Sequence, residues 1–139
     1  MELIYLDTNV YLDYLEGRTD KLRPLGEFAF QLIKRAIECE FKIVVSSFVI
    51  EELENNIDMD KVDDLFDTLK KLNKIINLFP IKDDKDKAKE LSKNRDTHYS
   101  DALHAVLANR AGAEFLVTRN IKHFSNLNDL VKVVYPESI

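Results

Sequence analysis

Short apolar runs alternate with longer amphipathic stretches along almost the whole chain. The runs that we expect to form strands are residues 3–6, 42–46, 75–79, 114–117 and 131–134. The stretches between them carry apolar residues at helical spacing, and we expect helices at residues 9–16, 25–40, 47–56, 59–74, 85–94 and 99–111. Strands that alternate with helices need crossover connections, so this pattern predicts an α/β fold, a three-layer α/β/α sandwich with a mostly parallel sheet.

Composition limits the class of protein. A chain of 139 residues is one domain (residues 1–139) with room for one sizeable core. No apolar stretch approaches the ~20 residues of a membrane span, and the acidic start at Glu2 is unlike a signal peptide. The single cysteine, Cys39, falls in an expected helix and cannot form an internal disulfide, so we expect a reducing, cytoplasmic location. The net charge of −5 argues against a protein that coats nucleic acid, but it does not exclude a nuclease.

Polar side chains follow several of the expected strands. Asp7 ends the first strand, Glu51 and Glu52 lie on the helix after the second, and residues 118–120 follow the fourth. Asp101 begins the helix that leads into the fourth strand. Parallel topology brings these regions to the same edge of the sheet, where acids repel one another unless a cation lies between them. Carboxylate oxygens are the ligands that Mg²⁺ and Mn²⁺ prefer, so the pattern predicts a divalent-metal pocket.

Each of these residues also has a structural interpretation. Asp7 is a favoured helix N-cap, Glu52 suits the surface of an amphipathic helix, and Asn120 is a common turn residue. Asp101 is different because the rest of its helix is largely apolar, and an acid in such surroundings needs a partner or a metal. His104 lies three residues later, and we expect a packed or hydrogen-bonded histidine there rather than a ligand.

Four segments resemble the signature segments of the PIN domain family. They are residues 6–9 (LDTN), 46–53 (SSFVIEEL), 100–105 (SDALHA) and 116–124 (LVTRNIKHF). Their order and spacing match the family, and the resemblance runs from residue 3 to about residue 134. It implies a five-stranded parallel sheet with a metal-dependent ribonuclease site at its carboxyl edge. Many small members are toxins of VapBC-type toxin–antitoxin pairs, so the resemblance also implies a homodimer and a cognate antitoxin partner.

The resemblance assigns roles to individual residues. Asp7, Glu52 and Asp101 match the family's three principal acids, which implies that they bind Mg²⁺ or Mn²⁺ and carry catalysis. Glu52 is preferred to Glu51 because it precedes Leu53 and lies six residues after Ser46, as in the family.

The fourth acidic position departs from the family pattern. Asn120 stands where many members have Asp, and its amide oxygen could still contact a metal. An amide in place of a carboxylate lowers the negative charge of the site. This favours one tightly held ion, with a second ion that arrives with the substrate. Asp96 is a candidate replacement for the fourth acid, or else a surface residue. The side chains that match the family's supporting polar positions are Thr8, Asn9 and Thr118.

The function we expect is hydrolysis of RNA phosphodiester bonds by a metal-activated water. Arg119 and Lys122 lie beside the pocket in sequence and are candidate phosphate contacts. Two other functions stay open: an RNA-processing PIN nuclease that is not a toxin, and a catalytically weak PIN-like RNA-binding or scaffold module. A phosphate-signalling receiver domain also places acids at strand ends, but the chain lacks the expected second acid beside Asp7.

Overall fold

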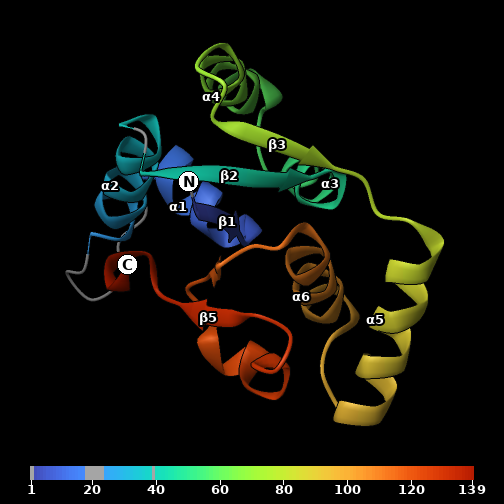
Figure 1. Cartoon of the computed structure of the whole chain (residues 1–139). Coiled ribbons are helices and arrows are strands. Elements are labelled where there is room, and N and C mark those ends of the chain that lie inside the picture. The colour runs from blue at the N-terminus through green and yellow to red at the C-terminus, as the bar shows by residue number, and fades with distance from the viewer. Residues whose placement is uncertain (1, 18–23, 39) are drawn as a thin grey trace.

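The sheet is parallel throughout. The structure is a computed structural model that describes residues 2–17, 24–38 and 40–139. These residues form a five-stranded sheet with the order β3-β2-β1-β4-β5, and every neighbouring pair is parallel (Figure 1). The strands are β1 (Glu2–Leu6), β2 (Phe41–Ser46), β3 (Ile75–Leu78), β4 (Phe115–Val117) and β5 (Lys132–Val134). The five predicted strands are confirmed, each to within one residue at either end.

Helices cover both faces of the sheet, which confirms the three-layer α/β/α arrangement. The α-helices are α1 (Thr8–Glu16), α2 (Leu25–Ile37), α3 (Ser47–Glu54), α4 (Met59–Lys71), α5 (Lys82–Arg95) and α6 (Tyr99–Ala111). Two short 3₁₀ helices, η1 (Ile121–Leu127) and η2 (Pro136–Ser138), flank β5. The α1 helix packs on α2 and α3, whereas α5 lies along α6, the yellow and orange pair in Figure 1.

Several helix ends differ from the predicted ones for local reasons. The α4 helix ends at Lys71 rather than residue 74, because Asn73 adopts a left-handed conformation with φ of 57°. The α5 helix begins three residues earlier than predicted, at Lys82, where the Asp84 carboxylate accepts the backbone N–H of Ile81 at 3.0 Å. The α6 helix ends as predicted at Ala111, and Gly112 is its C-cap, with φ of 74°.

The predicted helix over residues 25–40 ends at Ile37. Cys39, which we expected within that helix, lies outside the described residues. None of the helices in the described ranges is long and apolar enough to cross a bilayer.

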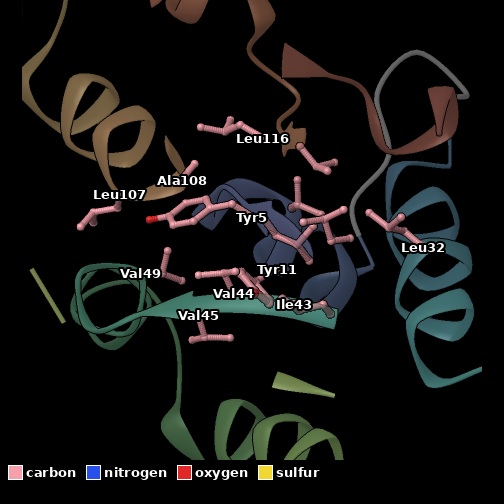
Figure 2. Close-up of a cluster of buried hydrophobic side chains, with 14 of the residues drawn as sticks. Tyr5, Tyr11, Leu32, Ile43, Val44, Val45, Val49, Leu107, Ala108 and Leu116 are labelled. Carbon is pink, nitrogen blue, oxygen red and sulfur yellow. The ribbon is translucent and has the colours of Figure 1, made fainter. Parts of the chain in front are cut away.

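The core is built around β1 and α6. Ile4, Tyr5 and Leu6 are completely buried, and residues 102–108 of α6 are all buried as well. Figure 2 shows Tyr5 in the middle of the cluster, between Leu107 and Ala108 of α6 and the side chains of β2. A tyrosine hydroxyl in such surroundings needs a hydrogen-bond partner, and its partners lead to the candidate site described below.

Gly26 marks a close approach between α1 and α2. A Cβ atom there would lie 2.8 Å from the carbonyl oxygen of Asp13 and 2.9 Å from the Cα of Gly17. Both are backbone atoms, so no side-chain rotation relieves the contact. We expect Gly26→Ala to lower the free energy of unfolding by about 1–3 kcal/mol, the usual cost of overpacking, as measured by urea denaturation.

A matched control is available on the exposed face of the same helix. Gln31→Ala should change the free energy of unfolding by less than about 0.5 kcal/mol. Equal stability of the two variants would contradict the close approach of α1 and α2.

Candidate metal centre at the carboxyl edge of the sheet

The site lies where the strand order reverses. From β1 the sheet grows through β2 to β3 on one side and through β4 to β5 on the other, and ligands of open α/β sheets bind at such a point. Asp7 directly follows β1, and Thr118 directly follows β4. The Thr118 hydroxyl donates to Asp7 Oδ2 at 2.8 Å, and the backbone N–H of Asp7 donates to the Val117 carbonyl, also at 2.8 Å. The ends of the two strands are thus joined through Asp7.

Asp7 also caps α1. Its Oδ1 atom accepts the backbone N–H of Thr8 at 2.8 Å, and its backbone is extended, as at a helix N-cap. The cap interpretation and the site interpretation of Asp7 are therefore compatible. One carboxylate oxygen holds the helix, the other meets Thr118, and both lie at the edge of the sheet.

Glu52 reaches the same place from α3. The helix begins at Ser47 because Ser46, the last residue of β2, accepts the backbone N–H of Val49 through its Oγ at 3.1 Å. Glu52 Oε1 then accepts the hydroxyl of Thr8 at 2.6 Å and lies 2.7 Å from Nε2 of His104. Glu51 is exposed, so Glu52 is the one of the two consecutive acids that faces the other site residues.

His104 is the residue that sequence reasoning left out of the site. The predicted hydrogen-bonded histidine is confirmed, but its partners are site residues: Nε2 lies 2.7 Å from Glu52 Oε1 and 3.6 Å from Asp7 Oδ1. Its Nδ1 lies 2.7 Å from the hydroxyl of Tyr5, which in turn lies 2.8 Å from Ser46 Oγ. The three-residue spacing from Asp101 was the sequence signal that could have placed His104 here.

Asp7, Glu52 and His104 form a compact set of metal-ligating groups. One ligand atom from each lies within 4.8 Å of the other two, and no other group of three such side chains occurs in the described ranges. Asp101 lies one turn before His104 on α6, half-buried and outside this set. Its Oδ2 atom is 3.9 Å from Nδ1 of His123.

The electrostatics of the site reflect acids gathered around one histidine. Burial works to raise the pKa of Glu52, but the hydrogen bond and charge of His104 and the hydrogen bond from Thr8 together lower it. Burial opposes the charged form of His104, yet the Glu52 hydrogen bond and the charges of Asp7, Glu52 and Asp101 raise its pKa. The pKa of Asp101 is raised by burial and then by the charge of Asp7. A divalent cation placed among these carboxylates would relieve that repulsion, so the donor set fits such an ion.

The supporting polar residues converge on Thr118. Asn9 donates from Nδ2 to Thr118 Oγ1 at 3.5 Å and accepts the backbone N–H of Arg119 at 3.4 Å. The backbone N–H of Asn120 donates to the same Thr118 hydroxyl oxygen at 3.0 Å, while the Asn120 side chain is exposed. Asp96, the candidate fourth acid, is also exposed and ends α5 in a left-handed conformation with φ of 50°.

Arg119 is held within the fold. Its Nη1 donates to both carboxylate oxygens of Glu137, at 2.8 and 2.7 Å, and its guanidinium lies near the rings of Phe28 and Tyr135. The side chain is only 11% exposed. Of the two predicted phosphate contacts, Lys122 is the exposed one.

This geometry defines the class of protein: an α/β domain with a cluster of acidic side chains at the switch point of a parallel sheet. A family model described as the PIN domain matches residues 4–130. The chain belongs to the PIN domain family, as its four sequence segments predicted.

Solved structures share the fold over nearly their whole length. VapBC2 from Rickettsia felis, bound to a DNA fragment from its promoter, has a TM-score of 0.67 at 18% identity. The match covers 96% of this chain and 98% of the other. A toxin–antitoxin complex from Klebsiella pneumoniae has a TM-score of 0.63 at 23% identity, with 98% of this chain and 99% of the other covered. VapBC-1 from nontypeable Haemophilus influenzae has a TM-score of 0.64 at 16% identity, with 96% and 98% covered. The search of curated proteins gave no match to this chain.

The raised pKa of His104 predicts how stability depends on pH. A histidine whose pKa is higher in the folded than in the unfolded chain stabilises the fold fully below the unfolded pKa, about 6.5, and loses that contribution as the pH rises through the folded value. We therefore expect the free energy of unfolding, measured with EDTA present, to fall as the pH rises above the unfolded pKa of about 6.5. His104→Gln should flatten this profile, and a profile that stays equally steep would contradict the assignment.

Proposed function

We propose that this chain is a divalent-metal-dependent ribonuclease that hydrolyses RNA phosphodiester bonds, and that it acts as the toxin of a VapBC-type pair. The observation that carries the proposal is the convergence of Asp7 and Glu52 at the switch point, with Asp101 near enough for the charge of Asp7 to raise its pKa. Membership of the PIN domain family supports nuclease chemistry at this edge of the sheet.

In this proposal Asp7, Glu52 and Asp101 hold the ion, Mg²⁺ or Mn²⁺. A divalent ion bound there lowers the pKa of an attacking water and offsets negative charge at the phosphate. Thr8 and Thr118 each donate a hydroxyl to one of the acids, which keeps the Glu52 and Asp7 carboxylates oriented.

The exposed residues beside the site, Asn120 and Lys122, would contact the RNA. Asn120 offers an amide oxygen there without adding charge, so we propose one tightly held ion and a second one that arrives with the substrate. Lys122 is exposed two residues further along and would contact a flanking phosphate.

The toxin assignment rests on the structural neighbours. All three are described as VapBC or toxin–antitoxin complexes, and each is covered almost completely by this chain. We therefore propose a cognate antitoxin partner, a homodimer and a cytoplasmic location. A gene for a small DNA-binding protein immediately upstream would support the toxin over an RNA-processing nuclease.

One observation favours a second function, a PIN-like binding or scaffold module. Glu52 Oε1 already accepts the Thr8 hydroxyl at 2.6 Å and lies 2.7 Å from His104 Nε2, so this carboxylate oxygen has partners within the protein. A scaffold would show no specific Mn²⁺ binding in a titration, whereas the proposed nuclease binds Mn²⁺ at this site.

The nuclease proposal is tested by Asp7→Asn. Asparagine caps helices about as well as aspartate, so the fold should persist while the negative charge is lost. We expect Mn²⁺-dependent cleavage of single-stranded RNA to fall by at least about 100-fold, consistent with loss of a charge-stabilising group in an active site. Glu51→Gln, at the exposed acid beside Glu52, is the matched control and should cleave at the wild-type rate. Full activity of Asp7→Asn would contradict the assignment of Asp7 to a metal site.

The same variant tests whether the acids repel one another. Removing one negative charge from the cluster should leave the melting temperature in EDTA unchanged or raise it, because like-charge repulsion is relieved. A drop of several degrees, as seen by circular dichroism, would instead assign Asp7 a mainly structural role.

A further inference from the structure

His104 lies where its imidazole can contact an ion held by Asp7 and Glu52. Its Nε2 is 3.6 Å from Asp7 Oδ1 and 2.7 Å from Glu52 Oε1. The ring is almost completely buried, and the rings of Tyr5 and Phe48 pack against it at centroid distances of 5.6 and 4.9 Å. These two ring contacts and the burial of the ring hold Nε2 close to the two carboxylates.

We propose that His104 is itself a ligand of the divalent ion, through Nε2, and that the site consequently prefers Mn²⁺ and later first-row ions to Mg²⁺. The inference rests on the proposed metal-dependent function and deepens it, because it names the ligand set and the class of ion. The donor set then gains one imidazole beside the carboxylates of Asp7 and Glu52, and Asp101 lies one turn away on the same helix as His104.

The contacts of the other ring nitrogen, Nδ1, support this role. A histidine that binds a metal through one nitrogen usually donates the other N–H to a neighbouring group, which fixes the tautomer. Here Nδ1 lies 2.7 Å from the Tyr5 hydroxyl, and that hydroxyl lies 2.8 Å from Ser46 Oγ. Both hydroxyls can donate or accept, so the chain can run from Nδ1–H to Tyr5 and on to Ser46. That direction leaves a lone pair on Nε2.

The chemistry of the donor atoms sets the preference for the ion. Mg²⁺ strongly favours oxygen ligands, whereas imidazole nitrogen suits first-row transition ions, whose affinities rise from Mn²⁺ towards Cu²⁺. A site of oxygens alone distinguishes Mg²⁺ from Mn²⁺ weakly. One imidazole in the inner sphere adds affinity for Mn²⁺ that Mg²⁺ does not gain.

The competing interpretation is that His104 only positions Glu52. In that arrangement Nε2–H donates to Glu52 Oε1, and Tyr5 donates to Nδ1 in turn. His104 would then affect every divalent ion alike, since it would act through the carboxylate. The two interpretations differ in whether nitrogen touches the ion, and that can be measured directly.

The experiment is pulsed electron paramagnetic resonance on the full-length chain loaded with Mn²⁺. We expect electron spin-echo modulation from a directly bound imidazole nitrogen, changing to the ¹⁵N pattern when the protein is labelled with ¹⁵N-histidine. His123→Gln is the matched control, because His123 is an exposed imidazole 3.9 Å from Asp101. The signal should survive in His123→Gln and disappear in His104→Gln. Where His104→Gln does not fold, survival of the ¹⁵N pattern in labelled His123→Gln excludes His123 as its source, and absence of any nitrogen modulation in the wild-type protein still contradicts the proposal.

Affinities measured by titration give a second test of the ligand set. Loss of the imidazole should weaken Mn²⁺ binding by at least the roughly 10–100-fold that loss of a residue supporting a ligand costs, and Mg²⁺ binding much less, so the preference for Mn²⁺ collapses. Bound Mn²⁺ without a histidine nitrogen signal, or equal losses for both ions in His104→Gln, would overturn the inference and leave the nuclease proposal intact. Absence of any specific Mn²⁺ binding would overturn both.

Discussion

The whole site depends on the central position of β1, which pairs with β2 on one side and with β4 on the other. Because all three strands are parallel, the residues that follow or end them, Asp7, Ser46 and Thr118, come to one edge of the sheet. The Asp7–Thr118 hydrogen bond then links the residues that directly follow β1 and β4. Ser46 starts α3, and that helix carries Glu52 to the same edge.

Gathering acids at a partly buried edge costs free energy, and the protein offsets that cost with hydrogen bonds. Thr8 and Thr118 each satisfy one carboxylate, and His104 places a cationic or hydrogen-bonding ring between Glu52 and Asp7. Tyr5 fixes that ring from the core side. The acids are consequently oriented by neutral hydroxyls and one imidazole, and the same contacts would hold them ready for an ion.

Much of this arrangement could be predicted from the order of residues along the chain. The five strands follow from short apolar runs, and Asp7 and Glu52 follow from their places after strands β1 and β2. The spacing from Asp101 could have placed His104 near the site, but the contacts of His104 and Arg119 could not be predicted in this way. The partner of His104, Tyr5, is 99 residues away, and Arg119 meets Glu137 eighteen residues later, so neither contact leaves a local pattern. The early start of α5 likewise depends on Asp84, whose carboxylate also pairs with Arg110 of α6.

The sequence by itself determined where the strands and the α-helices lie, apart from some helix ends. It also determined that the strands run parallel, because strands alternate with helices, and it determined the family. These depend on periodicity and on short segments, which act over a few residues. The tertiary structure decided which side chains lie together at the candidate site. It made Asp7 both a helix cap and a site residue, drew His104 in beside Glu52, and turned Arg119 into an internal partner of Glu137. Those outcomes depend on contacts between segments that lie far apart in the sequence, and only the folded chain brings these segments together.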